Sequence, residues 1–88
     1  MDLKDLRSQI DSIDDELVRL FGARMEIAAQ IADYKKQNGL PILVPARERE
    51  KLQDVAKKAG PEMADYVCRL YATIFELSRE HQSKQNHR

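Results

Sequence analysis

The stretch from Leu3 to Asn38 constrains the fold of this chain more than any other, because it contains no proline and a single glycine. Apolar side chains recur along it with the spacing of an amphipathic helix, which predicts one helix about 50 Å long. A compact chain of 88 residues has a radius of gyration of only about 12 Å, so its own residues cannot cover such a helix. The apolar stripe therefore predicts a partner, most simply a second copy of the chain.

One charged residue interrupts this stripe. With Leu3 at heptad position a, the a and d positions are Leu3, Leu6, Ile10, Ile13, Leu17, Leu20, Arg24, Ile27, Ile31 and Tyr34. A buried guanidinium such as that of Arg24 is costly unless an anion meets it. Lys35 follows eleven residues later, and eleven steps of about 100° return nearly to the same side of a helix. Either Arg24 fixes the register of a coiled coil while Lys35 extends to solvent, or both residues bind an anion.

The rest of the chain predicts two shorter helices. The first helix should span about 3–38 and end at a glycine, followed by a loop over 39–44. Proline at position 45 suits the first turn of a second helix over about 45–59, and Gly60-Pro61 should end it. A third helix is expected over about 61–83, before a polar tail at 84–88. Its expected buried face is marked by Met63, Val67, Leu70, Ile74, Leu77 and His81.

These patterns predict an all-α fold, in which three helices (long, short and medium) form a single domain over residues 1–88 and an interlocked homodimeric helical bundle. The 15 basic and 15 acidic side chains cancel, which argues against a nucleic-acid or membrane partner. Cys68 is the only cysteine, and no set of His, Asp and Glu has the spacing of a metal site. We therefore expect no metal and no cofactor. The lack of a long apolar run predicts a cytoplasmic protein.

Further polar residues lie beside the predicted apolar faces. Ser78 and Gln82 lie four residues apart on the third helix, and Arg47 and Glu48 open the second. Taken singly, these residues fit a helix-end pair and a solvated charge run. Together with the two cations of the first helix, they predict a pocket for a small polyanion that contains no nucleophile. The chemistry of such a pocket would come from positioning and fixed electrostatics.

The residues that define this pattern are Leu6, Arg7, Ile10, Ile13, Asp14, Leu17, Leu20, Arg24, Ala28, Tyr34, Lys35, Pro41, Arg47, Glu48, Arg49, Ser78 and Gln82. In this arrangement the chain resembles the all-helical class of chorismate mutases, and the resemblance covers almost its whole length. It implies an interlocked homodimer with two active sites. It also implies an isomerase that rearranges chorismate to prephenate in phenylalanine and tyrosine biosynthesis.

The resemblance further implies which residues bind the reacting part of the substrate. Arg7, Arg24 and Lys35 would bind the two carboxylates of chorismate. Lys35 and Gln82 would act as the catalytic residues by hydrogen-bonding the ether oxygen. Arg7 and Lys35 are 28 residues apart, which is about 42 Å along one helix. If both contact one substrate, Arg7 must therefore come from the other subunit.

Recognition of the substrate ring involves the second and third helices. By the same resemblance, Glu48 would accept a hydrogen bond from the ring hydroxyl, while Arg47 and Ser78 would complete the pocket. This chain has Val44 where the family commonly has an acidic residue just before the proline of the second helix. Recognition of the hydroxyl would then rest on Glu48 and the backbone, with lower affinity.

Two other functions account for parts of the pattern. An isochorismate-pyruvate lyase of the same fold shares the positions of Arg7, Arg24 and Gln82, but it lacks an arginine at the position of Arg47. A non-catalytic helical dimerisation module would explain the heptads. It would not explain why Arg24, Ser78 and Gln82 occur together.

Overall fold

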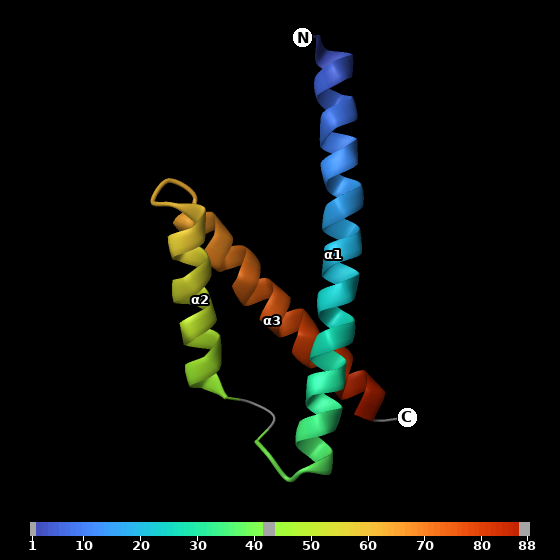
Figure 1. Cartoon of the computed structure of the whole chain (residues 1–88), viewed down its shortest axis with the longest axis vertical. Coiled ribbons are helices and arrows are strands. Elements are labelled where there is room, and N and C mark those ends of the chain that lie inside the picture. Colours follow the sequence, from blue (N-terminus) through green and yellow to red (C-terminus); the bar gives the residue numbers. More distant parts are fainter. Residues whose placement is uncertain (1, 42–43, 87–88) are drawn as a thin grey trace.

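The computed structural model describes residues 2–41 and 44–86, and these form three helices (Figure 1). Helix α1 spans Leu3–Gln37, α2 spans Pro45–Ala59 and α3 spans Ala64–Asn86. No strand occurs in this part of the chain, so the prediction of an all-α fold with long, short and medium helices is confirmed. Ile42 and Leu43, in the predicted loop, lie outside the described residues.

Both ends of α1 are capped. At the start, the Asp2 side chain accepts a hydrogen bond from the Asp5 backbone N–H at 2.9 Å. At the end, the Leu40 N–H donates to the Lys35 carbonyl at 2.8 Å, and Gly39 has a φ of 65°. This is the Schellman arrangement, in which glycine tolerates the left-handed conformation that stops the helix. The helix therefore ends within one residue of the predicted boundary.

Helix α2 begins at Pro45 and stops at Gly60, whose φ is 84°. The next helix begins at Ala64, three residues later than predicted, because residues 61–63 form a turn. In this turn the Met63 N–H donates to the Gly60 carbonyl at 3.2 Å. At its other end α3 continues to Asn86, so residues 84–86 are helical where a polar tail was predicted. Residues 87 and 88 lie outside the described part.

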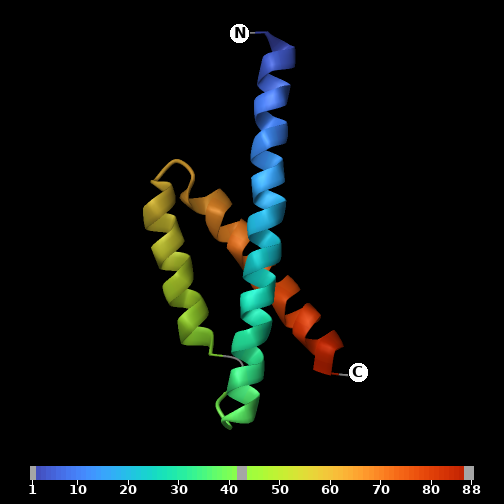
Figure 2. The same ribbon diagram turned by 45° about the vertical axis from the view of Figure 1, so that its right-hand side comes forward.

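The three helices contact one another to different extents. Helix α2 folds back on α3 as a helical hairpin, α1 crosses α3, and the backbones of α1 and α2 do not meet (Figures 1 and 2). Among the described residues, the buried apolar side chains are Val55 and Phe75. Ser78 is also buried, and its hydroxyl donates to the Met25 sulfur at 3.4 Å where α3 crosses α1.

Much apolar surface remains uncovered in the single chain. Every residue from Asp2 to Ala23 is exposed, and the radius of gyration is 16.2 Å, against about 12 Å for a compact chain of this length. The accessible surface is 7372 Å², whereas a compact monomer of this mass exposes about 5,300 Å². Within the described part, no helix is both long and apolar enough to cross a membrane.

The predicted buried face of α3 is also partly uncovered. Met63, Leu70 and Leu77 are 49%, 53% and 40% exposed, while Phe75 and Ser78 take the buried positions. The prediction was wrong for these three residues within one chain. The hairpin with α2 and the crossing with α1 bury a different face of α3, rotated about the helix axis from the face that was predicted.

Candidate active site

A cleft of about 330 Å³ lies between the C-terminal half of α1 and the start of α2, with α3 completing its wall. Its volume falls in the range of small-molecule sites. Its apolar lining consists of Ile27, Ala28, Ile31, Ala32 and Phe75. Its polar lining consists of Arg24, Lys35, Arg47, Glu48, Lys51 and Gln82. Three helices thus bring together five of the seven residues predicted for the site.

Arg24 enters this cleft from α1 and lies against two aromatic rings of α3. The central carbon of its guanidinium lies 5.6 Å from the ring centroid of Tyr71 and 5.6 Å from that of Phe75. The two rings meet edge to face, with centroids 6.1 Å apart. Such contacts attract a cation and restrict its side chain without neutralising its charge. Arg24 forms no ion pair within the described part of the chain, so its charge is available to an anion.

Lys35 and Gln82 line the same cleft from different helices. Lys35 lies three turns beyond Arg24 on the same side of α1, as the spacing of eleven residues predicts. Gln82 lies one turn beyond Ser78 on α3, and its amide donates to the Ala28 carbonyl at 3.4 Å. This hydrogen bond links the Gln82 side chain to α1 at Ala28, which itself lines the cleft.

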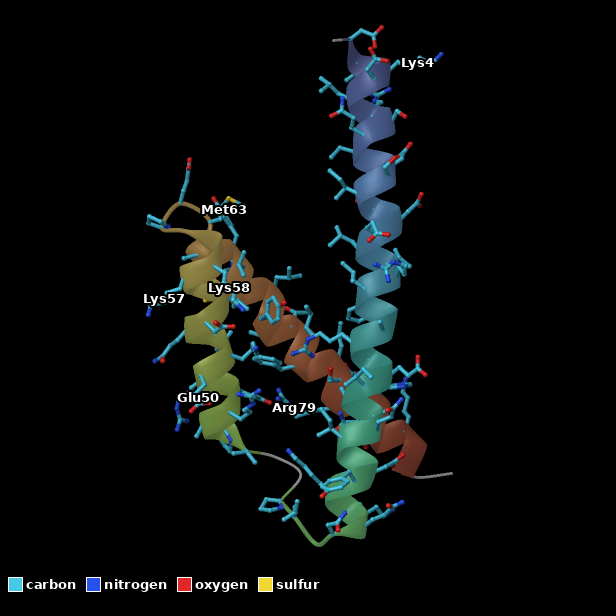
Figure 3. All side chains as sticks on the ribbon, in the orientation of Figure 1. Lys4, Glu50, Lys57, Lys58, Met63 and Arg79 are labelled. Atoms are coloured by element: carbon cyan, nitrogen blue, oxygen red, sulfur yellow. The ribbon has the colours of Figure 1, made fainter. Side chains whose placement is uncertain are left out.

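The first turns of α2 supply charges of both signs. Arg47 lies 3.5 Å from Glu50, with both side chains 70% exposed. The Glu48 carboxylate receives a hydrogen bond of 2.7 Å from Arg79 of α3. Figure 3 shows Arg79 between the two helices, extending toward α2.

Lys51, one turn further along α2, also lines the cleft. It lies 3.4 Å from Asp54, whose pKa is lowered, first by the hydrogen bond from Lys58 and then by Lys51 itself. Asp54 therefore stays ionised and pairs with Lys51 beside the cleft.

The charges of the cleft are strongly unequal. Arg24, Lys35, Arg47 and Lys51 contribute four cations, and Glu48 is the one carboxylate among the described residues that line it. An excess of cations with a few neutral donors suits a small molecule that carries more than one negative charge.

Two predicted site residues do not line this cleft. Arg7 lies on the exposed N-terminal part of α1, and the lining of the cleft begins at Arg24, 17 residues further along the helix. Ser78 is 8% exposed and lies under the crossing of α1 and α3, where it donates to Met25. The binding roles assigned to Arg7 and Ser78, like those of the five residues that line the cleft, remain predictions.

Several residues at the cleft were not predicted from the sequence. Lys51 lies four residues after Arg47, a helical spacing that could have placed it on the same face. The aromatic neighbours of Arg24 and the pairing of Arg79 with Glu48 depend on how α3 packs against the other helices. No local pattern in the sequence indicates that packing.

Known proteins match the chain over most of its length. Residues 6–83 match the family described as chorismate mutase type II. A chorismate mutase from Methanocaldococcus jannaschii is 30% identical over 79 residues, which are 90% of this chain and 78% of that protein. A 4-amino-4-deoxychorismate mutase from Streptomyces venezuelae is 33% identical over 75 residues, or 83% of this chain and 73% of that protein.

Longer proteins also contain this sequence pattern. A T-protein from Haemophilus influenzae is 52% identical over 61 residues, which are 66% of this chain, and the matched part is only 16% of that protein. No solved structure matches the chain significantly. The family match covers 78 of 88 residues, from Leu6 to Ser83. The resemblance in the sequence is thereby confirmed, and the chain belongs to the chorismate mutase type II family.

Proposed function

We propose that the chain is a chorismate mutase, an isomerase that converts chorismate to prephenate for phenylalanine and tyrosine synthesis. The observation that carries this proposal is the convergence of Arg24, Lys35 and Gln82 in one cleft, with the Arg24 charge unpaired. Chorismate offers two carboxylates, an ether oxygen and a ring hydroxyl. Those groups complement the cations, the neutral amide and the carboxylate that line the cleft.

The proposed roles follow from the charge of each side chain. Arg24 and Lys35 bind substrate carboxylates, and Arg47 completes the cationic side of the pocket. Ser78 is assigned to the pocket by the family resemblance alone. When ionised, Glu48 can accept hydrogen bonds but cannot donate one. The ring hydroxyl is the one donor on ionised chorismate, so Glu48 is its natural partner.

The reaction is an intramolecular rearrangement, so no side chain needs to form a bond with the substrate. The ether C–O bond breaks ahead of C–C bond formation, and partial negative charge collects on the ether oxygen. Lys35 and Gln82 stabilise that charge, while the cleft holds the folded conformer of the substrate. A rate gain of about a millionfold needs about 8 kcal/mol, which these two effects supply together.

We also propose that the functional unit is an interlocked homodimer. The support is the uncovered stripe of α1, whose a and d residues Leu3, Ile10 and Ile13 are 61%, 56% and 56% exposed. The chain exposes about 2,000 Å² more than a compact monomer, and burial of such a surface fits a stable dimer. In this dimer the long helices run antiparallel, and each cleft receives Arg7 from the partner chain.

Incubation of the purified protein with chorismate, followed by an assay for prephenate, tests the function directly. Arg24→Leu should abolish turnover and leave the dimer at least as stable, because a partly buried cation without an anion destabilises the empty protein. Salicylate and pyruvate formed from isochorismate would instead identify the lyase. Failure to convert either compound would favour a non-catalytic module. Collapse of the Arg24→Leu dimer would assign Arg24 to the helix register rather than to substrate binding.

A further inference from the structure

The ion pair between Arg79 and Glu48 connects two helices at the edge of the cleft. Its nitrogen and oxygen are 2.7 Å apart, and the side chains are 48% and 32% exposed. Arg69 and Asp65, by comparison, form a pair within one turn of α3 and are 73% and 80% exposed. The Arg79–Glu48 pair joins residues 31 positions apart, so it depends on the packing of α2 against α3.

Glu48 is the part of the cleft that can distinguish substrates by their ring substituent. It is the one carboxylate among the described lining residues, and the same lining contains four cations that suit the carboxylates of a substrate. Chorismate has a neutral hydroxyl on the ring. 4-Amino-4-deoxychorismate has an amine at the same ring carbon, which is largely protonated near neutral pH as simple amines are. The two compounds therefore differ mainly by a positive charge next to Glu48.

We propose that Arg79 is a specificity-determining residue that favours a ring hydroxyl over a ring ammonium. This inference rests on the proposed function of the cleft. Arg79 donates to one oxygen of Glu48 and so offsets part of the carboxylate's charge, and among the described residues no hydrogen bond to the other oxygen competes with a substrate hydroxyl. An ammonium at that position would gain less from a carboxylate already paired with Arg79 and would be repelled by the guanidinium.

The test compares chorismate and 4-amino-4-deoxychorismate in the wild-type protein and in three variants. Arg79→Met removes the charge at similar length, and Arg79→Lys retains it. Arg69→Met is the matched control, since it removes an arginine and its ion pair elsewhere on the same helix. For each protein, kcat/KM is measured for chorismate and for 4-amino-4-deoxychorismate. If the amino compound is not turned over, its inhibition constant against chorismate replaces kcat/KM.

In Arg79→Met, the preference for the amino compound relative to chorismate should rise about 2- to 5-fold, the range expected for a partly exposed ion pair. Arg79→Lys should restore most of the original ratio, and Arg69→Met should leave the ratio unchanged. The gain should shrink in 0.5 M salt, because exposed charges are screened. Circular dichroism melting curves establish that each variant is folded.

Equal loss of both activities in Arg79→Met, with an unchanged ratio, would overturn the proposal and reduce Arg79 to a structural link. Failure of the proposed function has a different signature, in which the wild-type protein converts no chorismate. Calorimetric binding of the two compounds to wild type and Arg79→Met would still give the ratio in that case. An unchanged binding ratio would then overturn the specificity role as well.

Discussion

The two halves of α1 carry the same apolar heptad but lie in different surroundings. The C-terminal half crosses α3 and lines the cleft with Arg24, Ala28 and Lys35, all partly buried. The N-terminal half projects beyond the other helices, and its residues are exposed (Figure 2). A periodic pattern thus defines which face of a helix must be covered but not which chain covers it.

The largest expected effect tests whether the two halves of α1 serve different active sites. Homodimers of Arg7→Ala and of Arg24→Ala should each lose about a thousandfold in turnover, as expected when a substrate-binding charge is removed. Unfolding and refolding an equal mixture should regain about a quarter of wild-type activity. Half of the dimers are then mixed, and each has one site with both arginines.

Native mass spectrometry provides the control for this experiment, because it counts the mixed dimers directly. If mixed dimers form and activity does not return, the two arginines do not share a site in the proposed way.

A smaller effect is expected when a charge is introduced into the uncovered apolar stripe of α1. Leu17, 55% exposed, lies at an a position, whereas Val18, 73% exposed, lies off the stripe. Leu17→Glu should raise the dimer dissociation constant by at least about a hundredfold, since it buries a charge in each chain. Val18→Glu is the matched control and should have little effect. Sedimentation velocity over a dilution series measures both, and equal behaviour of the two variants would count against the stripe as the dimer interface.

The cleft beside the C-terminal half of α1 can be tested through Gln82 of α3, whose neutral amide also lines it. In Gln82→Glu, the carboxylic acid can still donate to the ether oxygen, but the carboxylate repels the developing charge. Activity should therefore be highest at acidic pH and fall about tenfold per pH unit above the pKa of the new group. Wild type measured over the same pH range is the reference. A flat profile for the variant would remove Gln82 from this role.

The smallest effect concerns the local stability of the projecting half. Asp2→Ala removes the N-cap of α1 and should lower the free energy of unfolding by about 1 kcal/mol. Asp11→Ala, which removes the same charge from an exposed position within α1, is the control. Thermal melts measure the difference. Equal melting temperatures for the two variants would mean that the cap does not stabilise the dimer.

The helix ends were largely predictable because they depend on local chemistry. Gly39 and Gly60 adopt positive φ angles where glycine is needed, and Pro45 begins α2. The start of α3 was less predictable. The turn at residues 61–63 competes with a first helical turn, and no short-range signal separates the two.

The cleft was predictable in part, through spacing and charge. Lys35 shares a face with Arg24 because eleven residues complete three turns, and Glu48 follows Arg47 at the start of a helix. The contacts of Arg24 with Tyr71 and Phe75 were not predictable. They depend on how α3 crosses α1, which is set by packing between elements about fifty residues apart in the sequence.

The continuity of α1 from Leu3 to Gln37 has a further consequence for how the sequence can change. Because the helix has no break, the directions in which side chains point at its two ends are fixed relative to each other. Deletion of one residue between Arg7 and Arg24 would turn one end against the other by about 100° and shorten their separation by about 1.5 Å. Length changes should therefore be tolerated in the turn at 61–63 and excluded from residues 8–23, even though both segments are exposed.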